Sequence, residues 1–96
     1  MSDKQRICVD FDGTIYTGDA ANPIFPGCVK VLTELQQTYT IAIFSARLTD
    51  AERWHMSQLL REHGVPYDEI LPRKPDAAFY IDDKGRQFQG WDKLTL

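Results

Sequence analysis

The sequence predicts an α/β fold built on a parallel β-sheet. Four short apolar runs have the length and composition of strands, and two longer segments carry apolar residues at helical spacing. Strands that alternate with helices indicate parallel strands joined by right-handed crossovers. The chain has 96 residues, the length of one compact domain, so we expect residues 1–96 to form a single domain.

The first part of the chain predicts a strand, a loop and a helix. Residues 6–10 form the first apolar run, and residues 13–25 are rich in Gly, Asn, Asp and Pro, as in a loop with room for a small hairpin. Pro26 suits the first turn of a helix, where its missing N–H has no partner in any case. An apolar stripe follows at positions i, i+3, i+4 and i+7, formed by Cys28, Val31, Leu32 and Leu35.

The remaining strands are predicted at residues 39–44, 68–71 and 78–81. The run at 39–44 is apolar without alternation, as expected for a parallel strand covered on both faces. Near the end of the chain, Phe88 and Trp91 are expected to cover an edge of the core.

A second helix is predicted to begin at Thr49. Thr49 and Glu52 have the spacing of a capping box, in which each side chain accepts a hydrogen bond from the other residue's backbone N–H. Gly64 is placed to end the helix in a left-handed conformation. Its buried side is expected to carry Met56, Leu59 and Leu60.

Composition excludes several classes of protein. The net charge is −3 and no block of Lys or Arg occurs, which argues against a nucleic-acid partner, although a phosphorylated nucleic-acid end stays open as a substrate. No apolar stretch approaches the roughly 20 residues that cross a bilayer, and the polar N-terminus lacks a signal-peptide core, so we expect a cytoplasmic protein without membrane contact. Cys8 and Cys28 are expected to be buried thiols without a disulfide.

Polar residues that suit phosphate and metal chemistry follow three of the apolar runs. Asp10 and Asp12 end the first, Ser45 ends the second, and Asp82 and Asp83 end the last. The carboxyl ends of parallel strands meet at one edge of a sheet, where open α/β sheets bind ligands. Four carboxylates at one point repel each other unless a cation lies among them. The pattern therefore predicts a divalent metal and a phosphorylated substrate.

The spacing of the first two acids favours phosphoryl transfer. Gly13 lets the chain turn away from the strand while both carboxyl groups stay near one point, so that one can attack phosphorus and the other can handle protons. A simple turn is the alternative interpretation, because Asp-Gly is a common turn pair. The Ser45 hydroxyl and backbone N–H could hold a phosphoryl oxygen.

Cationic residues are also candidates for the site. An ammonium group at Lys74 would lower the repulsion between a carboxylate nucleophile and phosphate, and Arg73 competes with it for this role. Arg47 could reach a substrate phosphate or lie on the surface. The acids at 82 and 83 are hard oxygen ligands that favour Mg²⁺, with a solvated turn as the alternative.

In this order, the residues Asp10-Phe11-Asp12-Gly13-Thr14, Ser45, Lys74 and Asp82-Asp83 resemble the four motifs of the haloacid dehalogenase (HAD) superfamily of phosphohydrolases. The resemblance covers residues 7–83. It implies a HAD-like core, which is a three-layer, Rossmann-like parallel sheet. It also implies a hydrolase that acts through an aspartyl-phosphate intermediate.

The resemblance assigns roles to these residues. Asp10 would be the nucleophile and Asp12 the general acid and base. Magnesium would bind the Asp10 carboxylate, the Asp12 backbone carbonyl and one acid of the late pair, with Asp83 as the direct ligand and Asp82 supporting it. The predicted phosphate- and substrate-binding residues are Gly13, Thr14, Ser45, Arg47 and Lys74.

The chain departs from many members of that superfamily because no cap domain is inserted. Such an enzyme would have an open site, which suits a bulky phosphorylated substrate unless a second subunit of a homo-oligomer covers it. We therefore expect a capless magnesium-dependent phosphatase that hydrolyses a phosphate monoester. Two alternatives stay open: a receiver-like phospho-acceptor domain, whose motifs come in a different order, and a catalytically silent HAD-like binding module.

Overall fold

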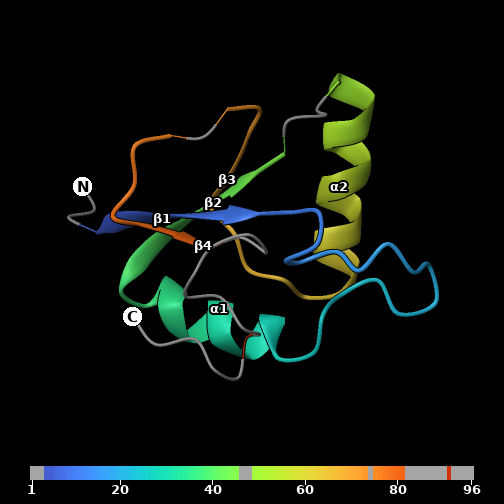
Figure 1. The fold of residues 1–96 in the computed structure, drawn as a ribbon, viewed down its shortest axis with the longest axis horizontal. Coiled ribbons are helices and arrows are strands. Elements are labelled where there is room, and N and C mark those ends of the chain that lie inside the picture. Colours follow the sequence, from blue (N-terminus) through green and yellow to red (C-terminus); the bar gives the residue numbers. More distant parts are fainter. Residues whose placement is uncertain (1–3, 46–48, 74, 82–90, 92–96) are drawn as a thin grey trace.

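The computed structural model describes residues 4–45, 49–73, 75–81 and 91. These residues form a four-stranded sheet in the order β3-β2-β1-β4, with every neighbouring pair parallel (Figure 1). The predicted parallel α/β fold is confirmed at this level. In chain order the elements are β1 (Gln5–Asp10), α1 (Cys28–Gln36), β2 (Tyr39–Phe44), α2 (Asp50–Glu62), β3 (Glu69–Leu71) and β4 (Phe79–Ile81).

The register of the sheet brings equivalent strand ends together. Asp10 at the end of β1 pairs with Phe44 at the end of β2, and Phe44 pairs with Leu71 at the end of β3. On the other side of β1, Val9 pairs with Ile81, the last residue of β4. The four strands therefore finish at a common edge, as the parallel arrangement predicts.

The α1 helix begins later than the sequence predicts. Gly27 precedes it with φ of 85°, a left-handed conformation that interrupts the helical path, so Pro26 lies before the helix and not in its first turn. A Cβ at position 27 would lie 3.3 Å from Cβ of Trp91. This contact joins segments that are far apart in sequence, and local sequence rules cannot detect it.

The ends of α2 follow the prediction. The Thr49 hydroxyl accepts a hydrogen bond from the Glu52 N–H at 3.1 Å, and the Thr49 N–H donates to Glu52 Oε1 at 3.2 Å. At the other end Gly64 has φ of 67°, and the Val65 N–H donates to the Leu60 carbonyl at 2.9 Å. These bonds satisfy backbone groups that the helix itself leaves unpaired.

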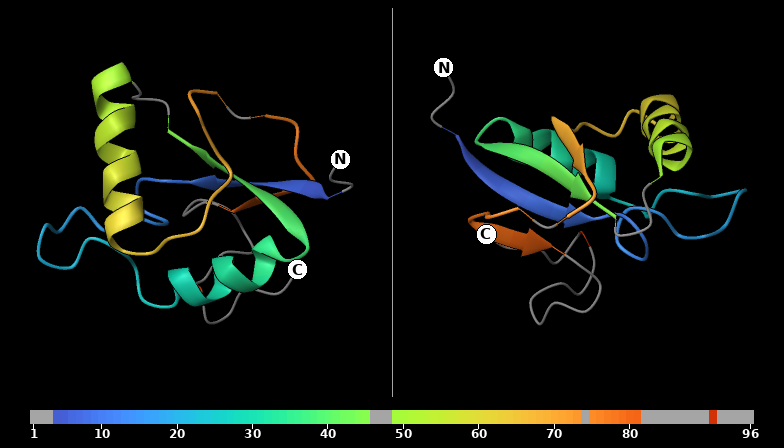
Figure 2. Two further views of the ribbon diagram at one scale, coloured as in Figure 1. Left: turned by 180° about the vertical axis from the view of Figure 1, so that it is seen from behind. Right: turned by 90° about the horizontal axis from the view of Figure 1, so that it is seen from above.

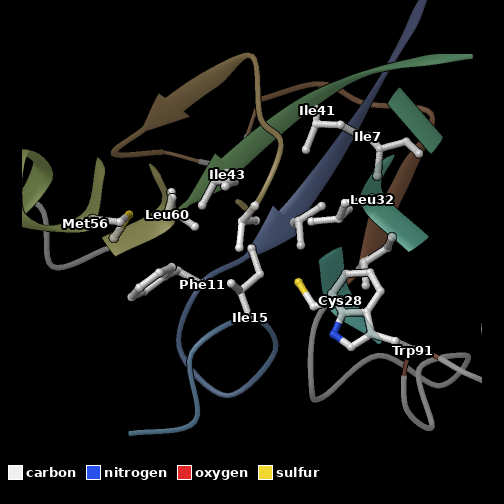
Figure 3. Packing of buried hydrophobic residues seen from close by; sticks show 13 residues of the cluster. Ile7, Phe11, Ile15, Cys28, Leu32, Ile41, Ile43, Met56, Leu60 and Trp91 are labelled. Carbon is white, nitrogen blue, oxygen red and sulfur yellow. The ribbon is translucent and has the colours of Figure 1, made fainter. Parts of the chain in front are cut away.

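Both helices pack on one face of the sheet. The connections β1–α1–β2 and β2–α2–β3 step in the same direction, so right-handed crossovers put both helices on the same side. Figure 3 shows their side chains meeting those of the strands in one cluster. The fully buried members from strands and helices are Ile7, Val9, Ile41, Ile43, Ile81, Cys28, Leu32 and Leu60.

The opposite face of the sheet carries Cys8 and Ala42, which are buried, and Tyr80, which is 48% exposed. The Tyr80 hydroxyl donates to the Pro75 carbonyl at 2.8 Å and accepts from the Ala77 N–H at 3.2 Å. In the part of the chain that the structure describes, this face is bordered by the segment before β4 and carries no helix.

The remaining core predictions concern the cysteines and the late aromatic residues. Cys8 and Cys28 are buried and form no disulfide, as predicted, and burial raises the pKa of Cys28 to about 12. Trp91 is 3% exposed and belongs to the core, also as predicted. Phe88 lies outside the described residues. Neither described helix has the length and apolar character to cross a bilayer.

Candidate active site

The chain turns tightly where β1 ends. The Phe11 N–H donates to the Phe44 carbonyl at 3.0 Å, so the β1–β2 ladder continues one residue past Asp10. The carbonyl of Phe11 then accepts from the N–H groups of residues 14, 15 and 16 at 3.4, 3.0 and 2.9 Å. Gly13 has φ of 80°, which permits this compact loop. Asp12 is therefore held on a hydrogen-bonded loop at the carboxyl edge of the sheet.

Asp12 and Ser45 meet at that edge. The Ser45 hydroxyl donates to Asp12 Oδ2 at 3.4 Å, although the two residues are 33 positions apart in sequence. Ser45 is only 3% exposed, and its N–H donates to the Leu71 carbonyl at 3.3 Å. A hydroxyl–carboxylate bond of this length is weak, since O–H···O distances are usually about 2.7–2.8 Å. The hydroxyl can therefore exchange Asp12 for another acceptor at little cost.

The segment after this loop forms a small hairpin. Tyr16 bridges Ile24 in an antiparallel sense, and the Thr17 N–H donates to the Pro23 carbonyl at 2.8 Å. The Tyr16 ring stacks on that of Phe11, with ring centroids 5.3 Å apart and an angle of 11° between the planes. Residues 13–25 thus contain the small hairpin that the sequence allows. The stacking of Tyr16 on Phe11 holds the base of this hairpin at the end of β1.

A cavity of about 410 Å³ opens between this hairpin and α2. Figures 1 and 2 show the hairpin segment and α2 lying together beyond the end of β1. Asp12 and Ser45 are at its sheet end, so the cavity leads to the predicted catalytic edge. Its lining residues are Phe11, Asp12, Tyr16, Ala20, Pro23, Ser45, Glu52, His55, Met56 and Leu59.

The sequence predicts no ligand-binding role for the individual α2 residues that line this cavity. Glu52 was interpreted only as a cap, Met56 and Leu59 only as core residues, and His55 was not singled out. A signal was present, because 52, 55, 56 and 59 follow the i, i+3, i+4, i+7 spacing of one helix face. This helix follows β2, which ends one residue before Ser45, and the connection brings that face to the same edge.

Thr14 has a different environment from the other residues of the motif. It is completely buried, and Trp91 Nε1 donates to its carbonyl at 2.9 Å. Its hydroxyl is buried without a hydrogen-bond partner among the described residues. In this structure Thr14 therefore packs beneath the loop and presents no surface to a phosphate group in solution.

Four predicted site residues lie outside the described residues: Arg47, Lys74, Asp82 and Asp83. The nearest described residues are Ser45 before Arg47, Arg73 and Pro75 on either side of Lys74, and Ile81 before Asp82. Ile81 is in register with Val9, so β4 ends beside the strand that carries Asp10. Strand order also reverses at β1, with β2 and β3 on one side and β4 on the other, which is where such sheets bind ligands.

The described part of the predicted metal site consists of Asp10 and Asp12. Their carboxylate and carbonyl oxygens are the hard donors that suit Mg²⁺. Within the described ranges, no three His, Cys, Asp or Glu side chains form a metal-binding group. The donors present fit magnesium, while the rest of the predicted set, Asp82 and Asp83, is not among the described residues.

Comparison of the chain with protein-family models, with curated proteins and with solved structures gave no match in any of the three.

Proposed function

We propose that this protein is a magnesium-dependent phosphatase that hydrolyses a phosphate monoester through an aspartyl-phosphate on Asp10. The observation that carries the proposal is the contact between Asp12 and Ser45 at the carboxyl edge, where a cavity opens. In this proposal the chain is a cytoplasmic HAD-like enzyme. The proposed fold is the three-layer, Rossmann-like HAD core.

In the first step, a carboxylate oxygen of Asp10 attacks phosphorus, and the bond between phosphorus and the alcohol oxygen breaks. Asp12 gives its proton to the departing oxygen. In the second step, a water molecule attacks the phosphorus of the aspartyl-phosphate while Asp12 takes its proton. Inorganic phosphate leaves and Asp10 is restored as a carboxylate.

Ser45 would hold the phosphoryl group during both steps. Its hydroxyl contacts Asp12 through a long hydrogen bond of 3.4 Å, and a phosphoryl oxygen is a stronger, charged acceptor. Its burial, at 3% exposure, keeps the donor oriented and away from bulk water. Lys74 is proposed as a second donor to the same group.

Magnesium would be held by Asp10, the Asp12 carbonyl and Asp83, with Asp82 in support. When bound, it offsets the charge of the carboxylates and of the phosphoryl oxygens, which otherwise repel the nucleophile from its target. The position of Asp10 and Asp12 at the end of β1, beside β2 and β4, supports this proposed role.

The test is turnover of an aryl phosphate with magnesium and with an excess of chelator. We expect turnover only with the metal, and turnover at background level in Asp10→Asn. Asp50→Asn is the matched control, because its side chain is fully exposed and does not line the cavity. Full activity in Asp10→Asn would disprove the nucleophile. A long-lived phosphoprotein without hydrolysis would favour the receiver-like alternative, and magnesium binding without turnover on any ester would favour a binding module.

A further inference from the structure

The cavity next to Asp12 and Ser45 is lined mainly by apolar side chains, with a few polar ones among them. Most of its lining is apolar, and the stacked pair of Phe11 and Tyr16 forms part of it. Pro23 closes the hairpin side and is buried. On the α2 side, Met56 is 7% exposed. A group that enters this space beyond the phosphate would therefore exchange water for apolar side chains.

The size of the cavity limits the group that can enter. A volume of about 410 Å³ is near the lower end of the range for small-molecule pockets, which is about 300–1,000 Å³. The hairpin and α2 form two walls above the carboxyl edge, and both belong to this chain. These two walls limit the size of the group that can lie between them beside Asp12 and Ser45.

The polar groups of the wall disfavour further negative charge. Apart from Asp12 and Ser45, the lining residues with polar side-chain groups are Tyr16 on the hairpin and Glu52 and His55 on α2. Glu52 already accepts the Thr49 N–H as part of the helix cap, so its carboxylate is held in place. With Asp10 and Asp12 at the same edge, a second anionic group on the ligand would lie near three carboxylates, those of residues 10, 12 and 52, which disfavour it unless a cation accompanies it.

We propose that this cavity binds the alcohol portion of the substrate and selects compact, mainly apolar phosphate monoesters that carry no second anionic group. This inference rests on the proposed phosphatase function and names its substrate class. The apolar walls stabilise such an alcohol portion by removing its surface from water. A polyhydroxylated alcohol of similar size would instead place part of its hydroxyl surface against apolar side chains and lose hydrogen bonds to water there.

The first test compares benzyl phosphate with glycerol 3-phosphate, since both release a primary alcohol. We expect kcat/KM to be about 10- to 200-fold higher for benzyl phosphate, the range that apolar pockets achieve by burying a few carbon atoms. Ala20→Gln should reduce this preference by about tenfold, because residue 20 lines the cavity and the new amide would occupy it. Ala21→Gln is the matched control, because Ala21 is also exposed, is next in sequence and is not part of the lining.

A second measurement separates this inference from the proposed chemistry. Calorimetry with the Asp10→Asn protein and magnesium measures binding of the same two esters without turnover. If the unaltered protein hydrolyses no ester, the phosphatase proposal fails. Even then, tighter binding of benzyl phosphate that is weakened by Ala20→Gln and not by Ala21→Gln would support the proposed binding preference of the cavity. Equal affinity and equal kcat/KM for the two esters, or the same effect from Ala20→Gln and Ala21→Gln, would overturn it.

Discussion

Replacing Trp91 by Phe tests whether a residue near the chain end supports the predicted catalytic loop. Trp91 is 3% exposed, and its Nε1 donates to the Thr14 carbonyl at 2.9 Å, two residues after Asp12 (Figure 3 shows the ring in the core). Phenylalanine keeps an aromatic ring but removes this donor and leaves a void where the larger ring stood. We therefore expect the folded state to be less stable, with the loss centred on the loop.

The magnitude follows from these two losses. A buried carbonyl left without its donor costs about 1–3 kcal/mol, and a void of about one methyl group or more adds about 1 kcal/mol. The free energy of unfolding should thus fall by about 2–4 kcal/mol. For a domain of this size, each 1 kcal/mol lowers the melting temperature by about 4–8 °C, so a decrease of at least about 8 °C is expected.

Urea unfolding followed by far-ultraviolet circular dichroism is the suitable assay, because it does not depend on tryptophan emission. Trp54→Phe is the control: Trp54 is 59% exposed, and surface changes of this kind usually stay within about 0.5 kcal/mol. Equal stability of the Trp91→Phe and Trp54→Phe proteins would refute the idea that the late segment supports the loop.

Three further predictions concern the helix cap, the buried thiol and the site hydroxyl. Thr49→Ala should lower the free energy of unfolding by about 0.5–2 kcal/mol through loss of the cap to Glu52, measured by urea unfolding, while Thr33→Ala on the exposed side of α1 should change it far less. The pKa of Cys28 is raised by burial from 9.0 to about 12, so the folded state keeps a proton that the unfolded state loses; this stability is complete below pH 9.0 and is lost as pH rises towards about 12. Urea unfolding across that window should show a smaller decrease for Cys28→Val than for the unaltered protein, and an equal decrease would contradict the assignment. Ser45→Ala should lower kcat for an aryl phosphate by about 10²–10³-fold if its hydroxyl stabilises the transition state, and a change in KM alone would contradict that role.

Local features of the sequence were reliable guides to single elements. Thr49 and Glu52 form the predicted capping box because both partners lie within one helical turn. Tyr39–Phe44 forms one of the two inner strands, because its unbroken apolar run suits a strand that is covered on both faces. The predicted start of α1 at Pro26 was wrong. Gly27 adopts a left-handed conformation beside Trp91, which is 64 positions away in the chain.

Part of the candidate site could be predicted from the sequence, and part depends on contacts between distant segments. The sequence predicted that Asp12 and Ser45 lie at one sheet edge, and their contact is consistent with parallel pairing of β1 and β2. The cavity beside them depends on the hairpin and on the α2 face that carries His55, and no single motif contains both walls. The burial of Thr14 likewise depends on Trp91, which contacts it from the far end of the chain.

By itself, the sequence determined the kinds of elements, their order and the chemistry at the strand ends, because hydrophobic periodicity, caps and turn residues act between near neighbours in the chain. Only the tertiary structure decided the strand order, the placement of both helices on one face and the cavity between the hairpin and α2. These features depend on contacts between distant segments, whose free energies are set by burial and shape and are not encoded in any local pattern.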